Sequence, residues 1–200
     1  MQNVLADLAV ESEAATATAM RIARSYDEED APFRRFATAV AKYWVCKRAT
    51  PHAAEALECL GGNGYVEESG MPRLLRDSPL NSIWEGSGNV AALDVLRATV
   101  KEPEGLPAFM AECELGRGGN PLLDVHLDRL RSAAPPTEGD ARRVVEDLAV
   151  ALQASLLVRN APPEVADAFC AGRLGEGGRV FGTLPASVNA PAIVERALAA

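Results

Sequence analysis

Apolar residues recur every three or four positions along most of the chain, the period of helices that bury one face. The first such stripe predicts a helix over residues 4–25, and a run of acids after it predicts a solvated turn. A second stripe predicts a helix over residues 32–60, with Pro51 as a kink or a restart within it. Gly61 and Gly62 are expected to end this helix, because glycine readily adopts the left-handed conformation found just after helices.

The remaining pattern predicts shorter elements. A loop is expected before a short helix over residues 72–77, and a longer helix follows over residues 84–100. In the C-terminal half, glycine and proline interrupt the chain more often and separate the predicted helices. These are expected at residues 106–115, 121–133, 138–160, 163–173 and 190–199. The predicted fold class is all-α: an antiparallel helical bundle over residues 1–100, with a helical extension over residues 101–200 packed on it.

The composition agrees with this class and predicts no membrane span. The 200 residues are 48% hydrophobic, enough for a core without metal or disulfide support, and only 5% aromatic, which favours helices over a sandwich of strands. The longest apolar stretch, residues 148–157, is well short of the roughly 20 residues that cross a bilayer. Met1 is not followed by the basic and apolar segments of a secretory signal, so we expect a cytoplasmic protein.

Cysteine, histidine and charge exclude several kinds of site. The four cysteines are widely spaced, with no C-x-x-C pair, and are predicted to be buried thiols rather than disulfides or zinc ligands. The two histidines lie far apart in sequence, so no metal site is expected. The net charge of −8 divides evenly, since each half of the chain holds 10 basic and 14 acidic side chains. Charge alone therefore predicts no nucleic-acid binding, although a local arginine patch stays open.

Three short motifs are candidates for chemistry, and each has an ordinary structural explanation. Gly-Gly-Asn-Gly at residues 61–64 could simply stop a helix, and Arg76 beside Asp77 could be a surface ion pair. The third motif, Trp-Glu-Gly-Ser-Gly-Asn at residues 84–89, is more informative, because a glycine inside a helix costs roughly 1 kcal/mol relative to alanine. Without Cβ atoms, the backbone there could lie directly against a flat ring or a thioester chain, or against a neighbouring helix.

Taken together, the motifs resemble the signature of the acyl-CoA dehydrogenases. Residues 58–77 begin Glu-Cys-Leu-Gly-Gly-Asn-Gly-Tyr and continue with Glu68, Arg73 and Asp77. They match the signature at every defined position but the first, where the family usually has glutamine. Residues 84–89 occupy the place of the family's aromatic-Glu-Gly-Thr-x-Gln box. The residues around both motifs and the extension are similar to the AidB-type alkylation-response branch, so the resemblance implies the C-terminal helical domain of such an enzyme.

A catalytic base is implied by this resemblance. In the family, the glutamate at the place of Glu85 removes the α-proton of an acyl-CoA thioester while a hydride leaves the β-carbon for the flavin of FAD. A helix start lowers the pKa of a carboxylate and an apolar acyl pocket raises it, so bound substrate is expected to set the basicity of Glu85. Trp84 is expected beside the substrate or in the core. The side chains expected to hold the loop between the motifs are Arg73, Arg76 and Asp77.

The cofactor contacts implied by the resemblance fall into two groups. Ser87 and Asn89 match the positions that hold the FAD of the same subunit, and both side chains can donate and accept hydrogen bonds. Glu58, Gly61 and Gly62 match the segment that meets the adenosine diphosphate end of a neighbouring subunit's FAD. Unlike glutamine, an ionised carboxylate at position 58 cannot donate a hydrogen bond, and it would repel a phosphate unless turned away. The shared cofactor implies a homo-oligomer, either a dimer or a tetramer.

In the family, an N-terminal helical domain and a β-barrel complete the flavin and CoA pockets, and neither is found in these residues. The chain is therefore expected to be a fragment, a truncated product or a subunit that needs a partner, and to be inactive alone. Two alternatives stay open. One is a helical oligomerisation module without chemistry, and the other is an AidB-like flavoprotein that binds DNA, which the acidic charge disfavours. The candidate DNA patch comprises Arg129, Arg131, Arg142 and Arg143.

Overall fold

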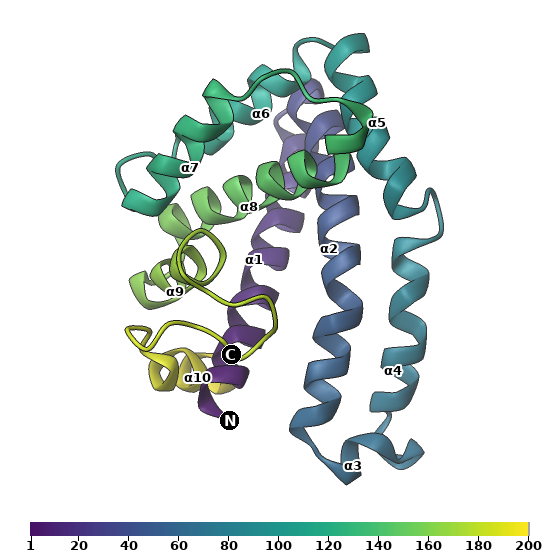
Figure 1. Cartoon of the computed structure of the whole chain (residues 1–200), viewed down its shortest axis with the longest axis vertical. Helices are drawn as coiled ribbons and strands as arrows, with labels where there is room; N and C mark the ends of the chain where they lie inside the picture. The colour runs from purple at the N-terminus through teal and green to yellow at the C-terminus, as the bar shows by residue number, and fades with distance from the viewer. Residues whose placement is uncertain (200) are drawn as a thin grey trace.

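Residues 1–199 are described by the structure, a computed structural model, and they form helices joined by loops and short 3-10 turns (Figure 1). Within these residues no strand is present, so the all-α prediction is confirmed. The first half contains α1 (Gln2–Asp27), α2 (Ala31–Cys59), α3 (Gly62–Tyr65), η1 (Glu67–Ser69), α4 (Met71–Asp77), η2 (Ser78–Ser82) and α5 (Gly88–Lys101). The second half contains α6 (Gly105–Glu114), α7 (Pro121–Ser132), η3 (Glu138–Asp140), α8 (Ala141–Asn160), α9 (Pro163–Arg173) and α10 (Ala190–Ala199). None of these helices is both long and apolar enough to cross a membrane.

Helices α1 and α2 pack against each other and are joined by a tight turn. The carboxylate of Asp30 caps α2 by accepting a hydrogen bond from the backbone N–H of Phe33 at 3.3 Å. Pro32 lies in the first turn, where its missing N–H leaves no helical hydrogen bond unmade. Helix α2 then continues through Pro51 without a restart.

Two local expectations differ from the structure. The helix predicted over residues 84–100 begins only at Gly88, because Glu85 and Gly86 have φ values of 54° and 112°, which an α-helix does not contain. The loop predicted before α4 contains the helical turns α3 and η1. The predicted stop after α2 is confirmed, and Gly61 there has a φ of 58°.

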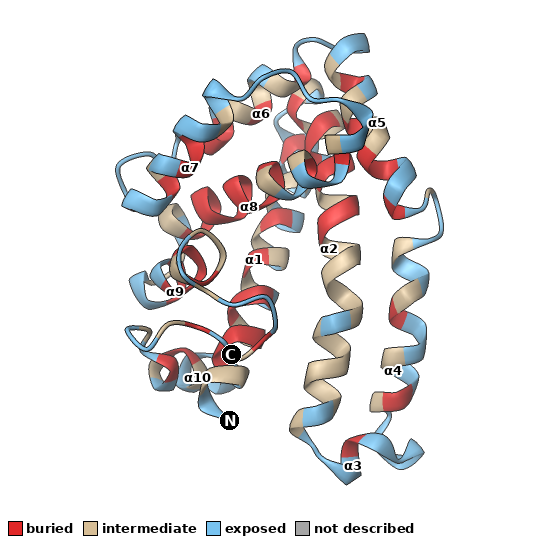
Figure 2. Ribbon diagram, viewed as in Figure 1, coloured by how far each residue is buried: buried red, intermediate tan, exposed pale blue. Residues whose placement is uncertain are grey.

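One hydrophobic core includes residues from both halves of the chain. Helix α8 packs against α1, α2, α5, α6 and α9, and most of its residues are buried (Figure 2). The ring of Phe109 on α6 stacks on that of Phe33 on α2, with centroids 6.2 Å apart. The buried indole of Trp44 on α2 donates a hydrogen bond to Gln153 on α8 at 2.9 Å. The extension thus supplies part of the core on which α1, α2 and α5 pack.

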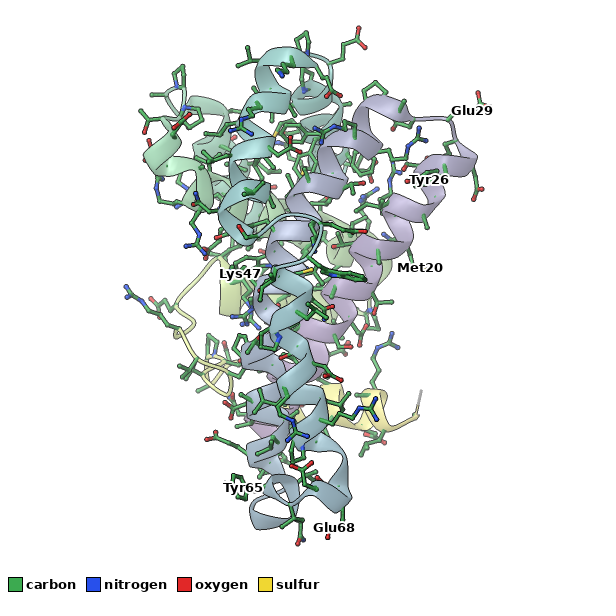
Figure 3. The ribbon with its side chains drawn as sticks, turned by 90° about the vertical axis from the view of Figure 1, so that its right-hand side faces the viewer. Met20, Tyr26, Glu29, Lys47, Tyr65 and Glu68 are labelled. Carbon is green, nitrogen blue, oxygen red and sulfur yellow. The ribbon has the colours of Figure 1, made fainter. Side chains whose placement is uncertain are left out.

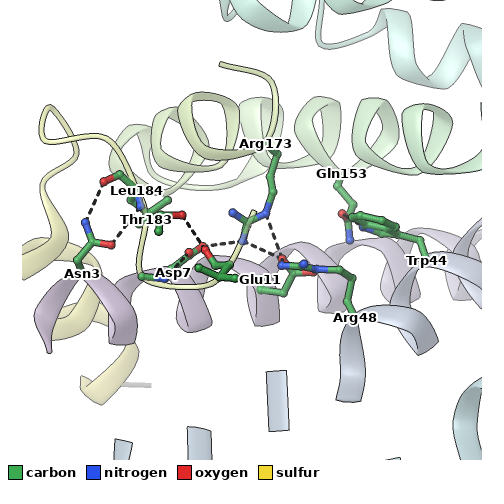
Figure 4. Close-up of polar contacts among 11 residues, drawn as sticks. Asn3, Asp7, Glu11, Trp44, Arg48, Gln153, Arg173, Thr183 and Leu184 are labelled. Atoms are coloured by element: carbon green, nitrogen blue, oxygen red, sulfur yellow. Dashed lines mark hydrogen bonds and ion pairs between the residues drawn. The ribbon is translucent and has the colours of Figure 1, made fainter. Parts of the chain in front are cut away.

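A buried ion-pair network also fastens the extension to α1 (Figure 4). Arg173, at the end of α9, pairs with Asp7 at 2.6 Å and with Glu11 at 2.9 Å, and both carboxylates are almost completely buried on α1. Arg48 of α2 pairs with Glu11 at 2.9 Å, and the backbone N–H of Gly182 donates to Asp7 at 2.9 Å. Burial raises the pKa of Glu11, but the two arginines outweigh this effect and hold that pKa below its usual range.

The C-terminal part of α2 leaves the core together with α3, α4 and η2 and forms a protruding arm, residues 45–82 (Figures 1 and 2). The buried residues of α2 all lie between Phe33 and Trp44. Large apolar side chains are exposed on the arm, namely Leu60, Tyr65, Val66, Leu74 and Leu80. The arm carries the glycine motif at its tip and leads back to Glu85, so it separates the two candidate motifs.

Candidate functional site

The turn that carries Glu85 has an unusual backbone. It joins η2 to α5, and its φ values of 54° at Glu85 and 112° at Gly86 both lie in the region that favours glycine. For an L-residue such as glutamate, the left-handed region costs roughly 1–2 kcal/mol. The N–H groups of Ile83 and Trp84 donate to the Leu80 carbonyl at 2.9 and 3.1 Å and brace the turn. A strained residue with an exposed carboxylate is a reason to suspect function.

Two lysines of α2 support this turn. The Lys42 ammonium donates to the backbone carbonyl of Asn81 at 2.6 Å. The Lys47 side chain lies against the start of α5, where a Cβ on Gly88 would come within 2.5 Å of its Cε. A positive φ accounts for Gly86, whereas the atoms nearest to a Cβ on Gly88 belong to the end of the flexible Lys47 side chain, which can move aside. Neither lysine was predicted to belong to the site, although they are two of the only three lysines in the chain.

Glu85 lies on the wall of an open cleft with a volume of about 970 Å³. The cleft runs between α2 and α5 and reaches the turn between α1 and α2; its lining includes Tyr26, Arg34, Lys42 and Arg97. Ser87 precedes α5 without a side-chain capping bond, and both Ser87 and Asn89 are exposed. The structure thus brings the predicted base and the two predicted same-subunit FAD contacts together at one accessible place.

The other three predicted FAD contacts lie at the tip of the arm. They are Glu58, Gly61 and Gly62, and all are exposed. Figure 3 shows Lys47 near the base of the arm and Tyr65 at its tip. From Lys47 to the end of α2 at Cys59 the helix rises roughly 18 Å. Within one chain, therefore, the glycine motif and the Glu85 turn are not brought together.

The arginine motif stabilises the arm. Arg76 forms two hydrogen bonds with Glu67, at 2.8 and 3.0 Å, rather than an ion pair with Asp77. Asp77 instead lies 3.7 Å from Arg73, because residues three or four apart share a helix face and adjacent residues do not. The hydrogen bonds from Arg76 lower the pKa of Glu67. The pair ties η1 to α4, and nothing in the sequence singled out Glu67 as the partner.

The arginines proposed as a DNA patch are mostly engaged with carboxylates. Arg129 pairs with Asp147 at 2.8 Å, and Arg131 pairs with Glu114 at 2.9 Å. The other two members also have partners. Arg143 pairs with Asp140 at 3.0 Å and Arg142 donates to the Tyr43 hydroxyl at 3.2 Å. Neutralised arginines release few counterions on meeting phosphates, so the geometry gives the DNA-binding alternative no support.

Two further predictions about side chains are resolved by burial. Trp84 is 55% exposed, so it is not part of the core. Cys113 and Cys170 are buried as predicted, whereas Cys46 and Cys59 are only partly buried, and all four are free thiols. Burial raises the pKa of Cys170 to about 12, which makes it a poor nucleophile.

The bundle matches a known protein family. The family model described as acyl-CoA dehydrogenase, C-terminal domain, matches residues 1–100. The chain belongs to the acyl-CoA dehydrogenase family. The putative acyl-CoA dehydrogenase AidB of Escherichia coli (strain K12) is 38% identical over 176 residues, which cover 85% of this chain. Acyl-CoA dehydrogenase family member 11 of Caenorhabditis elegans is 37% identical over 121 residues, or 60% of this chain.

A solved acyl-CoA dehydrogenase structure resembles both the bundle and the extension. The crystal structure of Caenorhabditis elegans ACDH-11 in complex with C11-CoA has a TM-score of 0.72 and 26% identity, covering 95% of this chain and 37% of that chain. The similarity to AidB also extends beyond the bundle. The family model matches only residues 1–100, whereas the alignment with AidB covers 176 residues of the chain. The chain covers 32% and 20% of the two curated relatives, and so spans about a third of their length or less.

Proposed function

We propose that this chain is the C-terminal part of an FAD-dependent acyl-CoA dehydrogenase in which Glu85 is the base. The observation that carries the proposal is the position of Glu85: an exposed carboxylate on a turn strained at the glutamate itself, at the wall of an open cleft. Glu29, in the turn between α1 and α2, has a similar φ of 55°, but it does not line the cleft. The C11-CoA bound to the dehydrogenase from Caenorhabditis elegans supports an acyl-CoA thioester as the substrate class.

The chemistry proposed for Glu85 is proton removal. Its carboxylate takes the α-proton of the thioester as the C–H bond at the β-carbon breaks and a double bond forms between the two carbons. FAD, when bound, supplies the acceptor for the hydride that leaves the β-carbon. The backbone N–H of Glu85 forms no backbone hydrogen bond within residues 1–199, so it is free to polarise the thioester carbonyl.

The residues of the chain fit the proposed FAD contacts. Ser87 and Asn89 are exposed donors and acceptors at the N-terminus of α5, where the helix dipole favours negative charge. At the arm tip, Gly61 and Gly62 have open space where Cβ atoms would lie, so another molecule can approach their backbone closely. Glu58 is exposed, which leaves its carboxylate free to turn away from a phosphate.

A homo-oligomer is part of this proposal. The arm tip and the Glu85 turn are separated by most of the length of the arm, so an FAD held by Ser87 and Asn89 would meet Glu58, Gly61 and Gly62 of another copy. The exposed apolar side chains of the arm support burial against such a partner. Because the cleft is open in this chain, we also propose that the 200 residues alone do not dehydrogenate acyl-CoA.

The test is Glu85→Gln in the FAD-containing full-length protein, mixed anaerobically with acyl-CoA while the flavin absorbance is followed. Loss of a general base should slow flavin bleaching by about 10²–10⁴-fold without changing FAD content. The matched control is Glu138→Gln, an exposed carboxylate of the extension outside the cleft, which should bleach at the normal rate. Equal bleaching in the two variants would reject Glu85 as the base. A full-length protein that takes up no FAD would favour an oligomerisation module without chemistry.

A further inference from the structure

The segment between α9 and α10, residues 174–189, is a strap that carries one large buried side chain, Phe181. Phe181 is 7% exposed, yet within residues 1–199 the hydrophobic core does not include it. The Arg48 guanidinium lies 4.4 Å from the centroid of its ring, and the Arg173 guanidinium lies 5.8 Å from it. The ring of His52 meets that of Phe181 edge-on, with centroids 5.5 Å apart. Phe181 is therefore buried against the arm and α9 rather than in the core.

The strap is fastened to α1 next to Phe181. The backbone N–H of Gly182 donates to Asp7 at 2.9 Å. The side chain of Asn3 donates to the carbonyl of Leu184 at 3.0 Å and accepts from the N–H of the same residue at 3.1 Å (Figure 4). Because these bonds lie within three residues of Phe181, α1 fixes the place of its ring.

The two side chains of α2 that contact Phe181 lie on either side of a weak point in the helix. Pro51 has no N–H, so the helical hydrogen bond to the carbonyl of Lys47 is missing. Arg48 precedes Pro51 and His52 follows it, and residues four apart share a helix face. Burial lowers the pKa of His52, so its ring is uncharged at neutral pH. The ring of Phe181 thus spans the place where α2 bends most easily.

A bend at this place would move the tip of the arm. Helix α2 has no buried residue beyond Trp44, and α3, α4 and η2 pack against α2, so they follow its direction. The helix ends at Cys59, eight residues after Pro51, which is about 12 Å along its axis. A bend of about 20° at Pro51 would therefore displace the end of α2 by roughly 4 Å. This distance exceeds the length of a hydrogen bond, so contacts made at the tip would be lost.

We propose that Phe181 is a positioning residue, which holds the arm in the direction that lets its tip reach the FAD of another copy. This inference rests on the proposed function, because Glu58, Gly61 and Gly62 at the tip are FAD contacts only in that proposal. The strap belongs to the extension, beyond the matched family domain of residues 1–100. The extension thus contributes to FAD binding through the arm.

The first test follows the arm in this chain by amide hydrogen exchange. In Phe181→Ala, residues 52–57 should exchange about three- to tenfold faster, the effect expected from loss of an aromatic contact. Phe181→Leu, which keeps apolar bulk but has no ring, should show a smaller increase. The matched control is Val180→Ala, because Val180 is the preceding residue of the strap and is 68% exposed. Thermal unfolding verifies that each variant is folded. Equal exchange in the Phe181 and Val180 variants would overturn the proposal.

The second test measures FAD affinity in the full-length protein by flavin fluorescence. Phe181→Ala should weaken FAD binding by about tenfold, the loss of one hydrogen bond to a charged group at the arm tip. At saturating FAD it should bleach with acyl-CoA at the normal rate, because the Glu85 turn is unchanged. Val180→Ala should bind FAD normally. Equal FAD affinities in the two variants, or slow bleaching of Phe181→Ala at saturating FAD, would reject the positioning role.

The two proposals fail in different ways. Glu85→Gln should keep FAD and bleach slowly, whereas Phe181→Ala should lose FAD affinity and bleach normally once saturated. Normal bleaching by Glu85→Gln would reject the proposed base and leave the role of Phe181 standing. A full-length protein that takes up no FAD would reject the proposed function, and with it the cofactor role of the arm.

Discussion

Removal of Arg173 should destabilise the whole fold, because it leaves buried charge without a partner. Asp7 and Glu11 are 1% and 4% exposed, and Arg173 contacts them at 2.6 and 2.9 Å. In Arg173→Leu, Glu11 would keep its pair with Arg48, but Asp7 would keep only the hydrogen bond from the N–H of Gly182. Breaking a buried ion pair on one side costs about 3–5 kcal/mol, so the free energy of unfolding should fall by that amount.

Urea unfolding followed by circular dichroism measures this loss. Arg179→Leu is the matched control, since it removes an exposed, unpaired arginine of the segment that follows α9, and it should cost less than about 0.5 kcal/mol. Adding Asp7→Asn to Arg173→Leu should recover part of the loss, because it removes the unpaired carboxylate. Equal unfolding free energies for Arg173→Leu and Arg179→Leu would refute the assigned role of the network.

The cost of Arg173→Leu should also depend on pH. In the unaltered chain, Arg48 and Arg173 outweigh burial and hold the pKa of Glu11 below its usual range. A carboxylate whose pKa is lower in the folded chain than in the unfolded chain stabilises the fold. This stabilisation is fully present above the unfolded-state pKa of glutamate, about 4.3, and is lost as the pH falls through the pKa of the folded state. The difference in unfolding free energy between the two proteins should therefore narrow at about pH 3.5 relative to neutral pH. If the difference in unfolding free energy stayed constant over this pH range, the lowered pKa assigned to Glu11 would be contradicted.

Two substitutions test the turn at the site. Glu85→Gly should leave the chain equally stable or up to about 1 kcal/mol more stable, because relief of the left-handed strain offsets the greater conformational entropy that glycine loses on folding. The control, Glu68→Gly on η1, should lower the free energy of unfolding by roughly 0.5–1 kcal/mol. Equal losses in urea unfolding would argue against strain at Glu85. Lys42→Met should loosen the turn by removing its bond to Asn81, which hydrogen exchange of residues 83–87 should report as faster exchange. If these residues exchanged no faster in Lys42→Met than in the control Lys101→Met, Lys42 would not support the turn.

The long helices could be predicted from the sequence because their buried faces repeat with the helical period. The apolar stripe predicted α1 and α2 to within a few residues, and glycine and proline separated the helices of the extension. The start of α5 was predicted four residues too early, because periodicity does not reveal that a glutamate adopts a positive φ. The short turns α3 and η1 were missed because they contain too few residues for a helical repeat of apolar positions to appear.

The candidate site could be predicted only where its residues are contiguous. Glu85, Ser87 and Asn89 lie together because they share one turn and the helix start that follows. The cations of the cleft come from distant parts of the sequence, and only the packing of α2 against α5 brings Arg34 and Arg97 to one cleft.

Exchange of the α-proton of acyl-CoA with solvent tests the central claim most directly, because it follows the proton that Glu85 is proposed to remove. The full-length protein with FAD is incubated in heavy water with an acyl-CoA, and loss of the α-proton signal is followed by nuclear magnetic resonance. The unaltered protein should exchange the proton, and Glu85→Gln should exchange it at least about 100-fold more slowly with FAD still bound. Exchange at the same rate in both proteins would contradict the account.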